Sequence, residues 1–187
     1  MKIALAQLNY HIGNFERNVS RIKSSIRYAK NKGAELVVFA ELAITGYTPR
    51  DFLEFEDFID KCDQAVKEVA TACNGIAAII GAPAKNPEYE GKDLFNAAYF
   101  LADGKVETVR HKTLLPNYDV FDEYRYFEPN KSFDIVKLKD KKIALTICED
   151  LWNVGNNPLY TINPLDEIMD QHPDLIINIA ASPFNYE

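Results

Sequence analysis

Residues 3–39 read IALAQLNYHIGNFERNVSRIKSSIRYAKNKGAELVVF, and this stretch decides the fold. Residues 3–8 are mostly apolar and form a short run, which predicts a buried strand. From residue 15 to residue 32, apolar side chains recur at helical spacing, behind Asn14, a residue type that favours the start of a helix. Residues 36–39 are an unbroken apolar run, as in strands covered on both faces. Strand, helix and strand in this order predict a βαβ unit.

The rest of the chain continues the alternation of strands and helices. Residues 95–101 and 105–110 flank Asp103-Gly104, a dipeptide that favours a hairpin turn. The other predicted elements are a helical region at 51–73, a short helix at 163–171, and strands at 76–82, 143–147 and 175–179. We find no internal repeat or linker, so residues 1–187 are expected to form one α/β domain with partly antiparallel sheets.

The amino-acid composition limits the classes of protein to which this chain could belong. The 187 residues are 47% hydrophobic and 26% charged, with a net charge of -7, and no basic run occurs. Such a chain is a poor candidate for binding nucleic acid or an anionic membrane. The first strand turns polar too early for a signal peptide, and no apolar run could span a bilayer, so a cytoplasmic location is expected.

The cysteines and histidines do not predict a disulfide framework or a metal site. The cysteine count is odd, with residues Cys62, Cys73 and Cys148, and no CxxC pair occurs. The three histidines lie far apart and lack metal-ligand spacing. We therefore expect no metal.

Three polar residues follow strand-like runs. Glu41 follows 36–40, Lys112 follows 106–111, and Cys148 follows 143–147. Because active sites of α/β proteins gather beyond the carboxyl ends of strands, we expect these side chains to converge. A carboxylate can take a thiol proton, and an ammonium can stabilise an oxyanion, with the backbone N–H of Glu149 as a second donor. Together they suffice for acyl transfer from an amide.

Each residue also has a structural interpretation. Cys148 alone is more often a small buried hydrophobe, Lys112 alone is usually a solvated charge, and Glu41 could cap a helix or lie on the surface. His111 alternates to the opposite strand face from Lys112, so we interpret it as structural. It is the combination of the three residues at strand ends that favours a catalytic site.

The same segments carry a family resemblance. Residues 39–47, FAELAITGY, resemble the glutamate motif of the nitrilase, or carbon–nitrogen hydrolase, superfamily. Residues 111–116, HKTLLP, resemble its lysine motif, and residues 147–152, ICEDLW, resemble its cysteine motif. Residues 3–9 resemble its first strand. The resemblance covers nearly the whole chain and implies a nitrilase-type α-β-β-α sandwich with mixed sheets.

Two segments narrow the resemblance to the glutaminase domain of glutamine-dependent NAD synthetases. These are residues 115–127, LPNYDVFDEYRYF, and residues 181–184, ASPF. The resemblance implies that Glu41 is the general base, that Lys112 stabilises the oxyanion, and that Cys148 forms a thioester with the glutamyl group. It implies no cofactor for this step.

The resemblance also implies supporting roles in substrate binding. Tyr118 and Phe121 would line the glutamine pocket, and Glu123 would hold Lys112 and help to position the substrate. Glu149 would belong to the substrate site, and Ser182 would contact the amino-acid end of glutamine. Phe121 could equally be a core residue, and Glu123 could be a structural ion-pair partner.

The sequence departs from the family in its extent. No Gly-Gly pair occurs, so the ATP-binding loop of the synthetase domain is absent, and ATP and Mg are expected only in that missing domain. The family's hydrolase domain continues past Ser182, so we expect this domain to lack its C-terminal part. An uncovered sheet edge would favour self-association, and a homo-oligomer is expected.

Three functions follow as alternatives. The first is glutamine amide hydrolysis that supplies ammonia to the synthetase domain of a parent enzyme. The second is a stand-alone nitrilase-type amidase or carbamoylase that acts on another carbon–nitrogen substrate. The third is a catalytically silent fragment kept for assembly.

Overall fold

The computed structural model describes residues 1–88, 90–153, 155, 158 and 160–182. Its strands are β1 (Ile3–Leu5), β2 (Leu36–Val38), β3 (Ala77–Lys85), β4 (Leu94–Ala102), β5 (Lys105–His111), β6 (Val136–Leu138), β7 (Lys141–Ile147) and β8 (Leu175–Ile179). Its helices are α1 (Phe15–Asn31), α2 (Glu56–Ala70), α3 (Glu123–Tyr126) and α4 (Pro164–Met169), with 3-10 turns η1 (Arg50–Glu54) and η2 (Cys148–Leu151).

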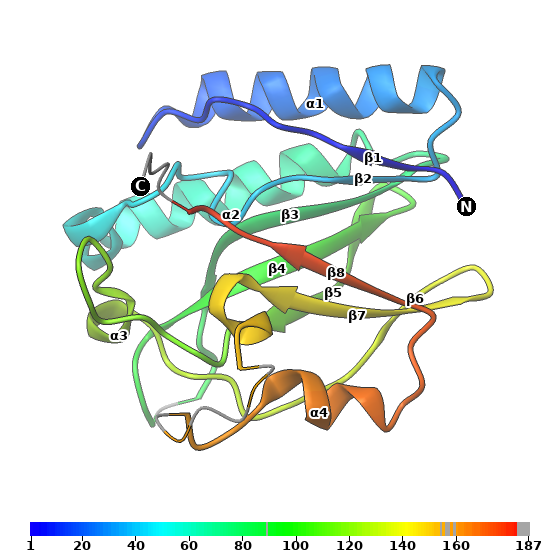
Figure 1. Cartoon of the computed structure of the whole chain (residues 1–187). Coiled ribbons are helices and arrows are strands. Elements are labelled where there is room, and N and C mark those ends of the chain that lie inside the picture. The colour runs from blue at the N-terminus through cyan, green and yellow to red at the C-terminus, as the bar shows by residue number, and fades with distance from the viewer. Residues whose placement is uncertain (89, 154, 156–157, 159, 183–187) are drawn as a thin grey trace, which may run out of the picture.

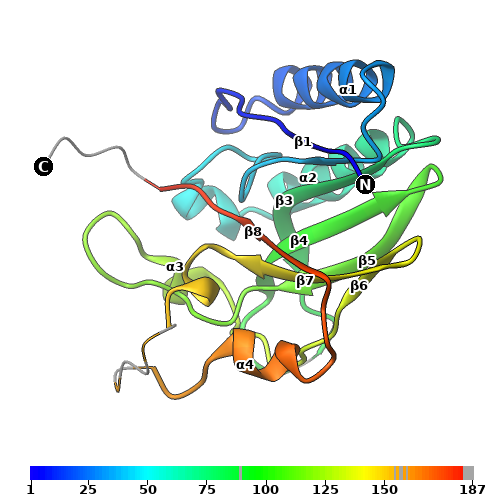
Figure 2. The same cartoon turned by 45° about the vertical axis from the view of Figure 1, so that its right-hand side comes forward.

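The strands form two mixed sheets. The first sheet has the order β1-β2-β3-β4-β5, with parallel pairing from β1 to β3 and antiparallel pairing from β3 to β5. The second has the order β6-β7-β8, in which β6 is antiparallel and β8 is parallel to β7. Helices α1 and α2 cover one face of the first sheet, the second sheet lies on its other face, and α4 lies outside the second sheet (Figures 1 and 2). The fold is therefore the expected α-β-β-α sandwich.

The alternation of side chains along β3 builds both core layers. Ala78 and Ile80 pack with α1 and α2, whereas Ala77 and Ile79 pack with apolar residues of the second sheet. Because successive side chains of a strand point to opposite faces, an apolar run can be buried on both sides. This is why β2 and β3 carry almost no polar side chains.

The predicted elements are present with shifted ends. The side chain of Asn14 accepts a hydrogen bond from the Arg17 N–H and caps α1, as predicted. The strand predicted at 3–8 ends at Leu5, and the helical region predicted at 51–73 is interrupted at Phe55, whose backbone is extended. Strand β6 and helix α3 were not predicted, because three or four residues are too few to show a periodicity.

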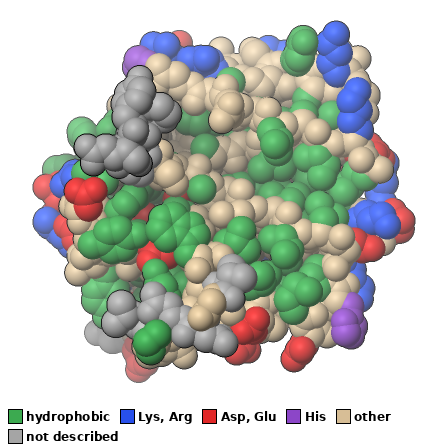
Figure 3. All heavy atoms as spheres, viewed as in Figure 1, with side chains coloured by type: hydrophobic (Ala, Val, Ile, Leu, Met, Phe, Trp, Pro, Cys, Tyr) green, Lys and Arg blue, Asp and Glu red, His purple; other side chains and the backbone are tan. Residues whose placement is uncertain are grey.

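Hydrophobic side chains gather on the face that carries β1 and β8 (Figure 3). Leu5 of β1 is 80% exposed and Ile176 of β8 is 44% exposed. β1 and β8 are edge strands of their sheets; self-association was expected through an uncovered sheet edge, and that expectation stays a prediction. No helix in the described part of the chain is long and apolar enough to cross a membrane.

Candidate active site

Glu41 lies in a tight turn that follows β2. The turn packs directly on β3, where the Gly81 N–H donates to the Ala40 carbonyl and the Gly81 carbonyl accepts from the Ile44 N–H, at 3.2 and 3.1 Å. A Cβ atom on Gly81 would lie 2.3 Å from the backbone nitrogen of Leu42, so only glycine allows this approach. The packing leaves the Glu41 side chain 1% exposed and directed to the adjoining strand ends.

Lys112 is the first residue after β5 and is fully buried. Its Nζ lies 2.8 Å from Glu41 Oε1 and 2.9 and 2.8 Å from Glu123 Oε1 and Oε2. Glu123 begins α3 and is 4% exposed. One ammonium therefore lies between two buried carboxylates, which accounts for its burial far from water.

Cys148 lies at the junction of β7 and η2 and is 3% exposed. Its φ is 48°, a left-handed conformation that non-glycine residues seldom adopt. The Asn178 side-chain N–H donates to the Cys148 carbonyl at 3.3 Å and links the turn to β8. Burial raises the pKa of the Cys148 thiol to about 12, and the nearby Glu41 carboxylate adds to the increase.

The charges of this group depend on one another. Burial raises the pKa of Glu41 above its ordinary value, although Lys112 works against the increase. Burial alone would lower the pKa of Lys112, but the Glu41 and Glu123 carboxylates raise it above its ordinary value. The resting group therefore holds an ammonium and a neutral thiol beside a carboxylate of increased basicity.

Asp150 fastens the lysine segment to the cysteine turn. Its carboxylate accepts hydrogen bonds from the backbone N–H groups of Thr113 and Leu114 at 2.9 and 2.8 Å, and from that of Ile147 at 3.3 Å. Burial raises the pKa of Asp150 to about 7, while these three donors lower it. This link was not predicted from the sequence, although Asp150 lies inside the cysteine motif.

Among the predicted substrate-binding residues, Tyr118 contacts both Glu149 and Phe121. The Tyr118 hydroxyl, on a residue 48% exposed, donates to Glu149 Oε2 at 3.4 Å, and the Tyr160 hydroxyl donates to Glu149 Oε1. Phe121 is half-buried, with ring centroids 5.5 Å from Tyr118 and 6.2 Å from Tyr47. Glu149 is thus a buried acid held by two tyrosines, of which Tyr160 was not foreseen.

The C-terminal segment reaches the predicted base. The Ala181 N–H donates to Glu41 Oε2 at 3.0 Å, and Ser182 follows as an exposed residue. Pro183 and Phe184, which carry part of the resemblance in this segment, lie outside the described residues. The structure therefore brings the backbone beside Ser182 to the acid, and the role of the serine side chain stays a prediction.

Two further polar residues contact the carboxylates and were not foreseen. The Asn96 side chain donates to Glu41 Oε1 at 2.8 Å and to Glu123 Oε2 at 3.1 Å, and the Tyr47 hydroxyl donates to Glu123 Oε1 at 3.0 Å. A signal was available for Asn96, since it interrupts the apolar strand LFNAAYFLA. A lone amide in such a strand needs a buried partner.

Other reactive side chains lie away from this group. His111 stacks on Phe95 at 4.1 Å between ring centroids, and burial lowers the pKa of His111 to about 4, with Arg110 adding to the decrease. Cys62 and Cys73 are buried in apolar clusters, and burial raises the pKa of each thiol to about 12. In the described ranges, no group of three or more His, Cys, Asp or Glu side chains is arranged to hold a metal ion.

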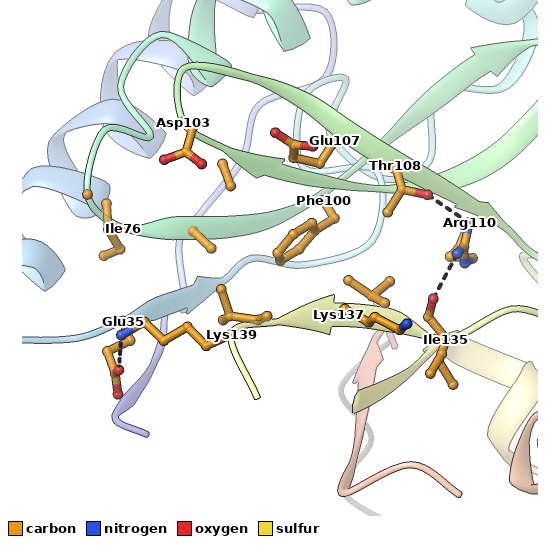
Figure 4. Close-up of a pocket in the computed structure, with 15 residues that line it drawn as sticks. Glu35, Ile76, Phe100, Asp103, Glu107, Thr108, Arg110, Ile135, Lys137 and Lys139 are labelled. Atoms are coloured by element: carbon orange, nitrogen blue, oxygen red, sulfur yellow. Dashed lines mark hydrogen bonds and ion pairs between the residues drawn. The ribbon is translucent and has the colours of Figure 1, made fainter. Parts of the chain in front are cut away.

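A cavity of about 770 Å³ lies between the β4–β5 hairpin and β6 (Figure 4). Some of its lining charges have partners: Lys139 contacts Glu35, and Arg110 donates to the Thr108 hydroxyl and the Ile135 carbonyl. Glu41, Lys112 and Cys148 do not line it. The strand-end group, rather than this cavity, is therefore the candidate active site.

A buried acid, lysine and cysteine meet at strand ends of an α-β-β-α sandwich, and these are the groups that acyl transfer from an amide needs. The sequence profile of the carbon–nitrogen hydrolase family matches residues 2–157, and the chain belongs to this family. Over 190 residues it is 38% identical to the glutamine-dependent NAD(+) synthetase of Synechocystis sp.. This aligned region covers 98% of the present chain and 34% of that relative. The glutamine-dependent NAD(+) synthetase of Thermotoga maritima is 34% identical over 188 residues, which cover 99% of the present chain and 31% of that relative.

Solved structures agree with this assignment. The glutamine-dependent NAD+ synthetase from Acinetobacter baumannii, in complex with ADP, matches with a TM-score of 0.86 at 29% identity, over 98% of this chain and 32% of that chain. An amidase from Nesterenkonia sp. matches with a TM-score of 0.80 at 20% identity, over 100% of this chain and 66% of that chain, which concerns the fold alone. The present chain spans about a third of the length of the curated synthetases.

Proposed function

We propose that this chain hydrolyses the side-chain amide of glutamine through a thioester on Cys148. The contact of Lys112 with two buried carboxylates, beside a cysteine held in a left-handed turn, is the observation that carries the proposal. The similarity to glutamine-dependent synthetases supports glutamine over another amide or a carbamoyl compound. An intact Glu41, Lys112 and Cys148 set speaks against an origin as a silent assembly module.

The first half of the reaction forms the thioester. Glu41 takes the thiol proton as the sulfur of Cys148 attacks the amide carbon, because the raised pKa of the thiol makes the neutral form the resting state. Lys112 and the backbone N–H of Glu149 stabilise the tetrahedral oxyanion. Glu41 then returns the proton to the leaving nitrogen, and the carbon–nitrogen bond breaks to release ammonia.

The second half regenerates the enzyme. Glu41 takes a proton from water as the water oxygen attacks the thioester carbon. The carbon–sulfur bond then breaks to release glutamate, and Glu41 returns the proton to the sulfur to restore the thiol. Glu123 holds Lys112, while Tyr118, Phe121, Glu149 and Ser182 bind the substrate. We further propose that a synthetase domain, such as the curated relatives contain, consumes the ammonia.

The test is covalent labelling of the whole chain with a glutamine-like diazoketone, read by intact mass. One adduct is expected on the starting protein, blocked by excess glutamine and absent from Cys148→Ala. A folded sample without an adduct would overturn the proposal for this chain. Labelling that excess glutamine leaves unchanged, but that another amide blocks, would favour an amidase with a different substrate.

A further inference from the structure

Asn96 makes hydrogen bonds to the lysine and to both acids of the site. It is a fully buried residue of β4, and its antiparallel partner on β3 is Pro83. The backbone carbonyl of Asn96 accepts a hydrogen bond from the Lys112 N–H at 2.8 Å. The main chain of Asn96 therefore fixes where the lysine leaves β5.

The side chain of Asn96 acts on the two acids that contact the same lysine. Its Nδ2 lies 2.8 Å from Glu41 Oε1 and 3.1 Å from Glu123 Oε2. These acids belong to different segments, the turn after β2 and helix α3. One amide thus bridges two carboxylates that would otherwise repel each other across a buried site.

The orientation of the amide favours this bridging contact over ordinary packing. Asn96 Oδ1 is buried and has no hydrogen-bond partner among the described residues. Turning the amide over would place Oδ1 against both carboxylates and leave them without these two donors. A buried acceptor is costly to leave unpaired, so the two N–H contacts outweigh that loss.

We propose that Asn96 is a positioning residue for the hydrolysis, and that its amide holds Glu41 and Glu123 at a fixed separation as hydrogen-bond acceptors. The inference rests on the proposed function, because it assigns Glu41 the part of base. Asn96 contacts the two acids and acts through their orientation and ionisation.

Other groups contact Glu41 and Glu123, and these contacts would remain if the Asn96 side chain were removed. Lys112 contacts both acids, the Tyr47 hydroxyl donates to Glu123, the Ala181 N–H donates to Glu41, and Cys148 lies near Glu41. In Asn96→Ala these groups stay, but each carboxylate loses one donor and the amide no longer joins the two acids. The ionised form of Glu41 is then harder to maintain, so more of the base is protonated at a given pH.

The experiment measures the rate of Cys148 labelling by the diazoketone as a function of pH. We call the decrease of the labelling rate toward low pH the acid limb. For Asn96→Ala we expect the midpoint of the acid limb to rise by about one pH unit, and the plateau rate at higher pH to fall about tenfold. Asn96→Ser keeps one hydroxyl donor and is expected to give a smaller shift. A shift of the acid limb is a response that loss of packing alone would not produce.

Gln171→Ala is the matched control. Gln171 is half-buried, its side-chain N–H donates to the Phe133 carbonyl at 2.5 Å, and its side-chain oxygen accepts from the Ile135 N–H at 3.3 Å, in segments that carry neither acid. This variant should lose stability without moving the acid limb. Wild-type protein that is not labelled would contradict the proposed function itself.

If the wild type is labelled and both Asn96 variants keep its pH profile, only the role of Asn96 is overturned. Failure of both Asn96 variants to fold would also overturn it, because the residue would then serve the stability of β4 rather than the site.

Discussion

At Lys112, one buried ammonium neutralises charge from two buried acids. Nζ lies within 2.9 Å of Glu41 and Glu123, and the exposed fractions of the three residues are 0%, 1% and 4%. Moving an ion out of water is costly, and the mutual attraction of the three groups offsets this cost. The lysine is therefore as much a structural requirement of the site as a partner for the oxyanion.

Replacing this lysine should destabilise the fold. In Lys112→Met we expect the free energy of unfolding to fall by about 3–5 kcal/mol, because two buried carboxylates lose their counter-ion. Adding Glu123→Gln should recover part of the loss. Urea denaturation followed by circular dichroism measures both effects.

The control is Lys61→Met, which removes an exposed pair with Asp57 at 3.7 Å and should change stability by less than about 1 kcal/mol. Equal losses in Lys112→Met and Lys61→Met would mean that the buried charges are not coupled as the geometry indicates.

The decrease of Cys148 reactivity toward low pH should reflect protonation of Glu41 rather than of a histidine. The pKa of Glu41 is raised above its ordinary value near 4.5, so reactivity should fall as the pH decreases through that raised value. The pKa of His111 is lowered to about 4, so His111→Gln should leave the limb in place. Diazoketone labelling between about pH 5 and 9 measures this; a limb displaced in His111→Gln would contradict it.

The elements show what the sequence could and could not predict. The βαβ unit and the hairpin follow from apolar runs and turn residues, and they are present. The convergence of Glu41, Lys112 and Cys148 followed from their positions at strand ends. The bridges made by Asn96 and Asp150 did not, because they join segments far apart in the chain. The Asp150 bridge also depends on how the two sheets stack, since it joins the turn after β7 to the segment after β5.

Asp150 is the link between two such elements, and its ionisation should appear in the stability of the fold. Its folded pKa, about 7, is raised from an ordinary value of 3.8. Its contribution to stability is therefore complete below the unfolded pKa and is lost as the pH rises through 7. We expect the stability of wild type relative to Asp150→Asn to decrease from about pH 4 to pH 8, measured by urea denaturation.

Asp174 is a control, because its contribution to stability should change with pH in the opposite direction from that of Asp150. Asp174 accepts a hydrogen bond from the Lys142 N–H at 2.7 Å, and this bond lowers its pKa. The contribution of Asp174 is present above its unfolded pKa and is lost as the pH falls through its folded pKa. The stability of wild type relative to Asp174→Asn should therefore decrease toward acid pH. A parallel trend in both variants would refute the assignment for Asp150.

For the whole molecule, the site exists only where the two sheets meet. Glu41 and Lys112 follow strands of the first sheet, whereas Cys148 follows β7 of the second. The layer between the sheets, which includes Phe100 and Ile147, therefore sets the separation of acid and thiol as well as the stability of the fold.

Loss of packing in that layer should affect both properties. Phe100 is 3% exposed on the inner face of β4, and Phe100→Ala should lower the free energy of unfolding by about 3–5 kcal/mol. Phe55→Ala, at a residue 56% exposed, is the matched control and should cost about 1 kcal/mol or less. Because a cavity lets the sheets shift, the labelling rate of Cys148 should fall in folded Phe100→Ala and not in Phe55→Ala. A destabilised Phe100→Ala protein with unchanged labelling would contradict the idea that packing between the sheets sets the separation of acid and thiol.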